Sequence, residues 1–432
     1  MSNDEKKNGH VERNKALDAV KKKLLGKRLT YKEIYAVMDE IAKKRFDDVL
    51  TTYFTASGYS NGFDSKELYY LTKAMVETGE KLKFAGIVAD KHSIGGLPGT
   101  RTTLIVVPIV AAAGFTIPKS SSRAITTPSG TADDMEILAP VELSVKRIYE
   151  VVKKTNGCIV WGGSFNIAPA DDVIIKVEEP LLFESFDKIV VSIMAKKIAF
   201  GATHLVIDLP YGKTVKVHHI KDAELIKEKF HFLARKFNIK IRVLIHKTDE
   251  PVGRGIGPIL ETREALRVLQ QKPNRPVDLE VRSINLAGRL LDLCLRDSPN
   301  SLQTYVAKTH GNAIGWATHI LHSQQALTKM REIIKAQGGN PHIDSEKLSP
   351  GKYVFAMRAH KHGKIKSINS KNLTIITKIL GAPGAKGAGI FLHKKLTEAV
   401  EKGEHLYTLY SENMYNLKEA KESLSHFQIV EL

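Results

Sequence analysis

The chain has 432 residues, of which 43% are hydrophobic and 26% charged, and its formal net charge is +18. This length and balance predict a folded protein of two or three domains and exclude the fibrous, disordered and membrane-spanning classes, because no apolar stretch is long enough to cross a bilayer. The two cysteines, Cys158 and Cys294, are too few for a disulfide framework or a zinc ribbon.

The positive charge is spread along the chain, with a modest excess in the first 45 positions. No aromatic-interleaved strand or helix-turn-helix pattern accompanies it, so neither nucleic acid nor a membrane is an expected partner. A small anionic substrate would still gain from the field. The polar N-terminus has no signal-peptide apolar core, and we therefore expect a cytoplasmic protein.

The first part of the chain has a helical pattern. Residues 1–13 are expected to form a disordered tail, and apolar residues then recur at three- and four-residue spacing over 14–83. Thr30 and Asp64 stand where helix caps belong. These features predict a small all-helical domain, which the helical stretch at about 175–200 is expected to join.

From residue 84 the pattern alternates between buried strands and helices. FAGIVADK, at 84–91, reads as a strand, and LIVVPIVAAAGF, at 104–115, as a helix; TIPKSSS and TADDMEIL repeat the order. Such alternation predicts a parallel α/β sheet with ligands at the carboxyl ends of its strands. We expect this domain to span 84–170 and 201–338, followed by a β-rich C-terminal α+β subdomain at 339–432. The predicted fold class is thus α/β, with a helical domain, a large mixed α/β domain and that subdomain.

Residues 90–133 contain the composition of an anion-binding site. Two loops rich in Gly, Ser and Thr flank a short apolar stretch. Their cations are Lys91, Arg101, Lys119 and Arg123. Glycine allows close backbone approach, while N–H groups, hydroxyl groups and cations bind oxyanions. Phosphate or a phosphate-bearing substrate is the favoured ligand, and a glycine-rich structural turn is the alternative.

Several residues of these loops are candidate phosphate ligands. They are Lys91, Ser93, Thr102, Thr103, Ser121, Ser122, Arg123 and Thr131. His92 is a candidate proton donor to a leaving group, or else satisfies a loop carbonyl. Asp133 is as well explained by a helix N-terminus as by ligand contact.

A second pair, Ser192 and Lys196, lies four residues apart on a predicted helix and therefore shares one face. Such a pair can hydrogen-bond the carbonyl groups of a flat heterocycle, or it can simply be an exposed helix face. No metal site is expected, since there is no HExxH motif, His360 and His362 lack nearby acids, and Asp171 with Asp172 is weak evidence for magnesium. The chain also lacks a GxxxxGK[ST] loop and a dinucleotide fingerprint.

These motifs resemble the thymidine phosphorylase family of nucleoside phosphorylases. The resemblance rests on KHSIGGLPGTRTT, SSRAIT with Thr131, NGCIVWGG, APADD, SIMAKK at 192–197, PVGRGIGPILETREALRVL at 251–269 and GAGIFLHKKL from 387. Their forms are most similar to the branch with bacterial type 2 thymidine phosphorylases and archaeal AMP phosphorylases. Members of that branch usually carry an extra N-terminal domain, which we expect this chain to lack.

The resemblance implies reversible phosphorolysis of a nucleoside N-glycosidic bond, giving free base and pentose 1-phosphate, with inorganic phosphate as co-substrate and no cofactor. It adds Gly95 and Gly96 to the phosphate ligands, assigns Ser192 and Lys196 to the base, and makes His92 and Lys196 catalytic candidates. It also implies a homodimer through the helical domain, and substrate binding in a cleft that closes between the helical and α/β domains.

The resemblance leaves the substrate open at two positions. The family's base-contacting arginine aligns with Glu178, a departure from simple thymine recognition. Glu184, eight residues before Ser192, occupies the slot of an acid that AMP phosphorylases use to protonate the purine, or else is a surface acid. We expect a thymidine phosphorylase, with a nucleoside monophosphate phosphorylase as the alternative and a phosphoribosyltransferase less favoured.

Overall fold

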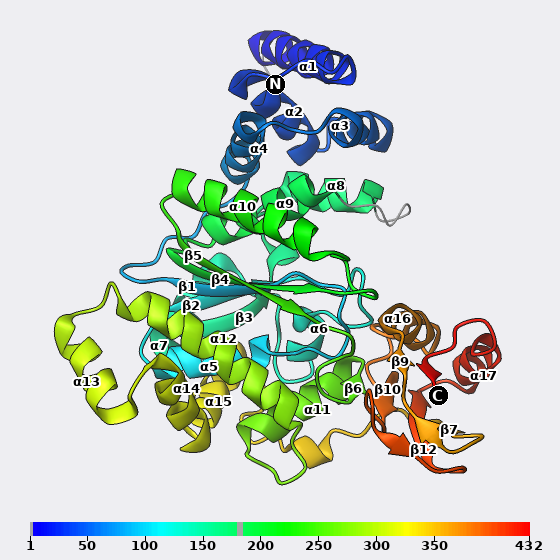
Figure 1. Cartoon of the computed structure of the whole chain (residues 1–432). Coiled ribbons are helices and arrows are strands. Elements are labelled where there is room, and N and C mark those ends of the chain that lie inside the picture. The colour runs from blue at the N-terminus through cyan, green and yellow to red at the C-terminus, as the bar shows by residue number, and fades with distance from the viewer. Residues whose placement is uncertain (1–2, 179–184) are drawn as a thin grey trace. The chain divides into compact units, whose positions relative to one another are not determined.

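The computed structural model describes residues 3–178 and 185–432, which divide into two compact units (Figure 1). The first unit holds the described residues up to 86, with 162–203 and 224–241. The second holds 87–161, 204–223 and 242–432. The first unit therefore includes a longer second segment than the expected 175–200, and also residues from a third.

Helices make up most of the first unit. They are α1 (Asn3–Leu24), α2 (Tyr31–Ala42), α3 (Asp48–Asn61), α4 (Ser65–Glu77), α8 (Pro169–Glu178), α9 (Phe186–Ala199) and most of α10 (Ile220–Lys236), with the short 3₁₀ helix Gly162–Ser164. Thr30 and Asp64 cap α2 and α4, each in a capping box. Inside this unit the ammonium group of Lys23 pairs with the buried Glu67 carboxylate at 2.9 Å.

The disordered tail expected for residues 1–13 is wrong for residues 3–13, which form the first half of α1. Ala16, Ala19 and Val20 bury one face of this helix, and that packing anchors it. Residues 11–15 are exposed and still helical, so the helix extends beyond the packed part. Polar composition alone did not distinguish a solvated helix from a tail.

Parallel strands form the centre of the second unit. β1 (Ala89–Ser93) pairs in parallel with β4 (His204–Tyr211), which adjoins β5 (Lys240–Lys247). β2 (Ile117–Ser121) pairs in parallel with β3 (Gly157–Trp161), and a bridge between Val88 and Thr116 joins the two groups. The register places Ser93 opposite Asp208 and Ser121 opposite Trp161, so the ends of neighbouring strands bring polar residues together.

Helices cover these strands and bury the main hydrophobic core. They are α5 (Thr103–Ala112), α6 (Thr131–Met135), α7 (Val145–Thr155), α11 (Pro258–Leu269), α12 (Val277–Leu295), α13 (Asn300–His310), α14 (Ala313–His322) and α15 (Gln325–Gln337). α5 is apolar all round because it is enclosed by α12, α14 and α15, which gather beside it below the strands in Figure 1. This packing fixes the start of α5 at the end of the first glycine-rich loop.

The C-terminal part of the second unit has its own hydrophobic cluster. Its main sheet is antiparallel, in the order β6 (Gly255–Ile256), β10 (Gly389–Leu392), β12 (His405–Ser411), β7 (Tyr353–Arg358). Its other elements are the 3₁₀ helix Ser345–Lys347, β8 (Gly363–Lys364), β9 (Ser367–Ile368), α16 (Ser370–Ile379), β11 (Ala399–Val400), α17 (Met414–Ser423) and β13 (Val430–Glu431). The predicted fold class, with helical, α/β and β-containing parts, is confirmed.

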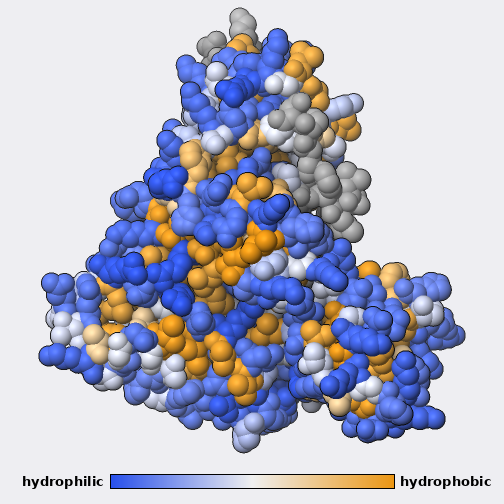
Figure 2. Space-filling model, viewed as in Figure 1, coloured by the Kyte–Doolittle hydropathy of each residue, from blue (hydrophilic) through white to orange (hydrophobic). Residues whose placement is uncertain are grey.

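Hydrophilic residues predominate on the face shown in Figure 2, with hydrophobic residues in separate patches. Within 3–178 and 185–432, no helix has both the length and the apolar character needed to cross a membrane.

Candidate active site

Lys91 brings a buried cation to the start of α5. It lies on β1, it is 1% exposed, and its ammonium Nζ donates to the hydroxyl oxygens of Thr102 at 2.6 Å and Thr103 at 3.3 Å. Burial lowers the pKa of Lys91 to about 8. A cation, two hydroxyl groups and a helix N-terminus therefore meet at one point, a combination that binds oxyanions.

Ser93, at the end of the same strand, contacts a charged cluster that sequence reasoning missed. Its hydroxyl donates to Asp208 Oδ2 at 2.7 Å, and Asp208 also accepts from Arg282 Nη2 at 3.0 Å and lies 3.4 Å from His246 Nδ1. Burial alone would raise the pKa of Asp208, but the charges of Arg282 and Lys91 lower it below its ordinary value. The detectable signal was an acid near the end of a predicted strand, HLVIDLPYG.

The two adjacent glycines of the first loop, Gly95 and Gly96, have different roles. Gly96 has φ +99°, and a Cβ there would lie 2.8 Å from the backbone nitrogen of Lys216, so both conformation and close packing require glycine. A Cβ on Gly95 would meet only the Thr126 hydroxyl at 3.9 Å, which leaves that backbone open. Gly96 thus sets the path of the loop.

The second loop folds tightly around its own backbone. Asp133 Oδ2 accepts from the N–H groups of Ala124 at 2.7 Å and Gly130 at 2.9 Å, and Ser122 O accepts from Ala132 N–H at 3.2 Å. The Asp133 carboxylate therefore stabilises the fold of the second loop. This role supports the interpretation of Asp133 as a helix N-terminal acid over that of a ligand contact. Thr131 begins α6 at the end of this loop.

Ser121 presents an unsatisfied hydroxyl at the end of β2. Its Oγ is buried and has no hydrogen-bond partner among residues 3–178 and 185–432. Leaving a buried hydroxyl without a hydrogen-bond partner costs free energy. An oxyanion that accepts a hydrogen bond from Ser121 would remove this cost. Of the predicted phosphate ligands, Ser121 carries the clearest sign of a missing partner.

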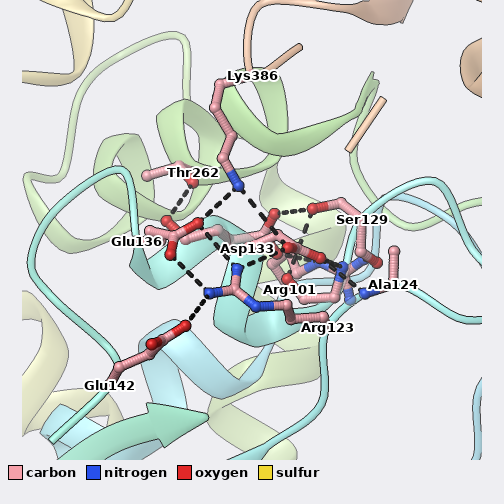
Figure 3. A network of polar contacts seen from close by, with 11 residues as sticks. Arg101, Arg123, Ala124, Ser129, Asp133, Glu136, Glu142, Thr262 and Lys386 are labelled. Carbon is pink, nitrogen blue, oxygen red and sulfur yellow. Dashed lines mark hydrogen bonds and ion pairs between the residues drawn. The ribbon is translucent and has the colours of Figure 1, made fainter. Parts of the chain in front are cut away.

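Arg123, a predicted phosphate ligand, is held by three carboxylates (Figure 3). Its guanidinium group donates to Glu136 at 2.8 and 2.9 Å, Glu142 at 2.9 Å and Asp133 at 3.3 Å, and it lies over the Trp161 ring at 4.8 Å. Hydrogen bonding to Glu136 is the largest cause that raises the pKa of Arg123. The sequence did not reveal these contacts, because the acids lie 10 to 19 residues away along the chain.

The two remaining cations of the segment have structural partners. Arg101 is buried against the carboxylates of Asp134 and Glu261, and so ties the first loop to α6 and α11. Lys119 is buried, with its ammonium group 3.8 Å from Asp90. Both residues therefore have partners within the protein and are less suited than Lys91 to bind an anion directly.

Asp171 joins the two predicted base-binding residues in the first unit. Its Oδ2 accepts from the Ser192 hydroxyl at 2.7 Å and from the Lys196 ammonium at 2.6 Å, and its side chain is 1% exposed. Burial would lower the pKa of Lys196, but the charges of Asp171 and Asp172 raise it. Lys196 and Ser192 are thus held on one face of α9 by a carboxylate that the sequence indicated only as weak evidence for magnesium.

Two acids, Glu178 and Glu184, were predicted to bear on the identity of the base. Glu178 pairs with the ammonium group of Lys188, one turn before Ser192 on α9. Lys188 and Asp171 also line a small cavity within the first unit, whose other walls are mostly apolar. Glu184 lies outside the described residues. His92 is half-buried on β1, where strand alternation directs it to the opposite face from Lys91 and Ser93.

The candidate phosphate ligands thus belong to the second unit, and Ser192 and Lys196 to the first. Among residues 3–178 and 185–432, no group of three or more His, Cys, Asp and Glu side chains is arranged to hold a metal ion. His360 and His362 are exposed between β7 and β8.

Three family models cover most of the chain. They are a glycosyl transferase family helical bundle domain at residues 17–79, a glycosyl transferase family a/b domain at 85–336, and a pyrimidine nucleoside phosphorylase C-terminal domain at 364–429. Among solved structures, anthranilate phosphoribosyltransferase from Thermus thermophilus matches 74% of this chain and 99% of its own, with TM-score 0.59 and 17% identity. That likeness shows a shared fold.

Curated relatives are similar over nearly the whole chain. The "Putative thymidine phosphorylase" of Legionella pneumophila (strain Paris) is 43% identical over 95% of this chain and 76% of the relative. The AMP phosphorylase of Thermofilum pendens is 42% identical over 93% and 76%, and that of Methanospirillum hungatei 42% over 94% and 77%. The chain is therefore a pentosyltransferase enzyme that belongs to the glycosyl transferase family of the thymidine and AMP phosphorylases.

Proposed function

We propose that the protein is a pyrimidine nucleoside phosphorylase whose preferred substrate is thymidine. A phosphate oxygen attacks C1′ of the sugar, the bond from C1′ to the base nitrogen breaks, and its electron pair leaves with the base. The products are free base and α-pentose 1-phosphate. One observation carries the proposal: the buried ammonium group of Lys91 contacts the Thr102 and Thr103 hydroxyls. These groups form a preorganised set of donors for an oxyanion.

Phosphate would take over contacts that these residues now make with one another. Lys91 and the start of α5 offer positive charge, and the unsatisfied Ser121 hydroxyl offers a further donor. Gly96 and the tightly folded second loop keep these donors in place before the ligand arrives. Preorganisation of this kind lowers the barrier by holding the nucleophile in position.

The leaving base needs a proton or a cation, and the first unit supplies candidates. Because Ser192 donates its hydrogen to Asp171, its oxygen is free to accept from a base N–H group. Lys196 remains protonated beside Asp171 and would donate to a base carbonyl. We assign His92 as the residue that protonates or hydrogen-bonds the departing base, as the family resemblance implies.

We propose that the reaction uses no metal or organic cofactor, with inorganic phosphate as the co-substrate. Charge that develops on phosphate and base is met by Lys91, Lys196 and backbone N–H groups in this account. Activity that survives a chelator unchanged is the expected result.

A nucleoside monophosphate substrate is the second candidate. It is favoured by relatives named AMP phosphorylases at 42% identity, and by Glu178, which pairs with Lys188 where the family resemblance expects an arginine. Glu184 would then protonate the purine. A phosphoribosyltransferase activity is less favoured, because the anthranilate phosphoribosyltransferase that shares the fold is only 17% identical in sequence to this chain.

The discriminating experiment compares kcat/KM for thymidine, uridine and AMP at saturating phosphate. The proposal expects thymidine to exceed AMP by at least about tenfold, a difference of about 1.4 kcal/mol in transition-state binding. A higher value for AMP selects the second candidate, and release of no base from any of the three contradicts both.

We further propose a cytoplasmic homodimer that serves nucleotide salvage. Its support is the family resemblance, together with exposed Val49 and Tyr53 one turn apart on α3 of the helical unit. Light scattering during gel filtration tests the dimer, and a monomer at micromolar concentration would contradict it.

A further inference from the structure

The loop between α16 and β10 anchors Lys386 against the α/β part of the second unit. The backbone N–H of Ile259, at the start of α11, donates to Lys386 O at 3.2 Å. Nearby, a Cβ on Gly257 would lie 2.4 Å from Ala388 O, so the two segments are packed backbone to backbone. The backbone position of Lys386 is therefore fixed by the fold.

The side chain of Lys386 reaches the same acids that hold Arg123 (Figure 3). Its Nζ lies 2.8 Å from Glu136 Oε2 and 3.7 Å from Asp133 Oδ1. Three carboxylates thus share two cations, one from the second loop and one from the C-terminal part. The pKa of Glu136 is lowered to about 2, chiefly by hydrogen bonding to Arg123 and then to Lys386, so Glu136 is ionised at neutral pH.

We propose that Lys386 is a positioning residue for phosphate binding, because it neutralises Glu136 and Asp133 and so allows Arg123 to exchange from these acids to the bound anion. The inference rests on the proposed phosphate site. It assigns to the C-terminal part a direct influence on the affinity for phosphate.

Carboxylates and phosphate compete for the guanidinium group of Arg123. Arg123 forms charge-assisted hydrogen bonds with carboxylates and would form similar ones with phosphate. When Arg123 leaves, Lys386 keeps one cation beside Glu136 and Asp133. Without Lys386, the departure of Arg123 would leave three carboxylates with no cation in the cluster. Arg123 is then retained more strongly by these acids, and phosphate binds more weakly.

Glu142 has the opposite effect on the same equilibrium. It contacts Arg123 at 2.9 Å but not Lys386, and its side chain is 57% exposed. Replacing Glu142 with a neutral residue removes one of the three carboxylates that bind Arg123, and this favours phosphate binding. Because these groups are partly exposed, each effect is expected to be about three- to tenfold.

The test is a titration of the purified full chain with inorganic phosphate, followed by calorimetry and by tryptophan fluorescence. Trp161 lies under the Arg123 guanidinium, so its emission reports the departure of Arg123. Lys386→Gln is expected to raise the Kd for phosphate about three- to tenfold, whereas Glu142→Gln lowers it. Lys386→Arg, which keeps the charge, is expected to stay near wild type.

Lys361→Gln is the matched control, since it removes the same charge from an exposed position of the C-terminal part. An unchanged Kd in this variant excludes a general field effect. Equal Kd values for wild type and Lys386→Gln, or a rise for both Lys386→Gln and Glu142→Gln, overturn the inference but leave the proposed function in place. If Lys386→Gln fails to fold, the sign of the Glu142→Gln effect decides alone. A wild-type protein that binds no phosphate overturns both proposals.

Discussion

Buried charges with specific partners occur both at predicted site residues, such as Lys91, and in structural pairs, such as Arg101 with Asp134 and Glu261. Lys91 and Asp171 are each 1% exposed, and each carries hydrogen bonds to residues that the sequence indicated independently. Such buried charges cost desolvation energy unless they are paired, and both of these have hydrogen-bonding or charged partners.

Phosphate affinity is expected to decrease above pH 8. The pKa of Lys91 is lowered to about 8 by burial, and phosphate favours the charged ammonium form. Binding is therefore tight below pH 8 and weakens by up to about tenfold per pH unit above it, until the anion-bound protein also loses the proton. Calorimetric titration from pH 7 to 9.5 measures this trend, and Lys91→Gln should abolish it. A wild-type affinity that stays constant over this range refutes the role.

Asp171→Asn is expected to lower kcat for base release by about 10- to 100-fold while the Kd for phosphate stays unchanged. The pKa of Lys196 falls when the negative charge is removed, because Asp171 is a leading cause that raises it. The alkaline limb of the kcat profile therefore moves to lower pH. Asp172→Asn, its exposed neighbour, is the matched control and should have a smaller effect. Equal effects of the two variants would show that Asp171 has only a structural role.

The sequence predicted which residues belong to the candidate site better than it predicted the side chains that they contact. Lys91, Thr102 and Thr103 were predicted together and do form hydrogen bonds with one another, because a strand end and a helix start are close in sequence. The three acids around Arg123, and Asp208 beside Ser93, depend on contacts between separate elements. No local pattern specifies such contacts.

Among the elements, the second loop of the candidate anion site has little room for change. A Cβ on Gly130 would lie 2.5 Å from both Arg123 C and Ser122 O and 2.7 Å from Ala124 N, all of them backbone atoms. The loop therefore reaches its conformation only with glycine at this position. Backbone atoms cannot yield as the end of a flexible side chain can.

Gly130→Ala is expected to lower the free energy of unfolding by about 1–3 kcal/mol and to weaken phosphate binding at least tenfold, because the loop must open. Urea unfolding and phosphate calorimetry measure the two effects. Gly384→Ala is the control, since its Cβ would meet nothing closer than 3.7 Å, and its effect should stay within about 0.5 kcal/mol. A Gly130 variant as stable as this control would contradict the packing argument.

Element types were readable where periodicity was strong. The strand–loop–helix order that leads from β1 through α5 and β2 to α6 was predicted from apolar runs and glycine-rich loops. The start of α1 was missed because a polar helix resembles a tail. The pairing of β6 with β10 joins residues more than 130 positions apart, and sequence patterns carry no register for such a pair.

Over the whole molecule, the sequence motifs and the family models indicate the same enzyme family. The identity of the base, in contrast, was predicted from two positions only, Glu178 and Glu184. Lys188 pairs with Glu178 through a contact that the sequence did not show, and Glu184 lies outside the described residues. Family membership is spread over hundreds of residues and was therefore readable. The two positions predicted to bear on substrate choice are single side chains, and the partner of Glu178 comes from the fold.

The most direct test of the central claim is ³¹P NMR of the protein with thymidine, inorganic phosphate and excess chelator. The account predicts that the phosphate signal decreases as an α-2-deoxyribose 1-phosphate signal grows, in equal amount to the thymine released. If the protein releases no base from any of thymidine, uridine and AMP under these conditions, or if base release requires diphosphate and magnesium, the account is contradicted.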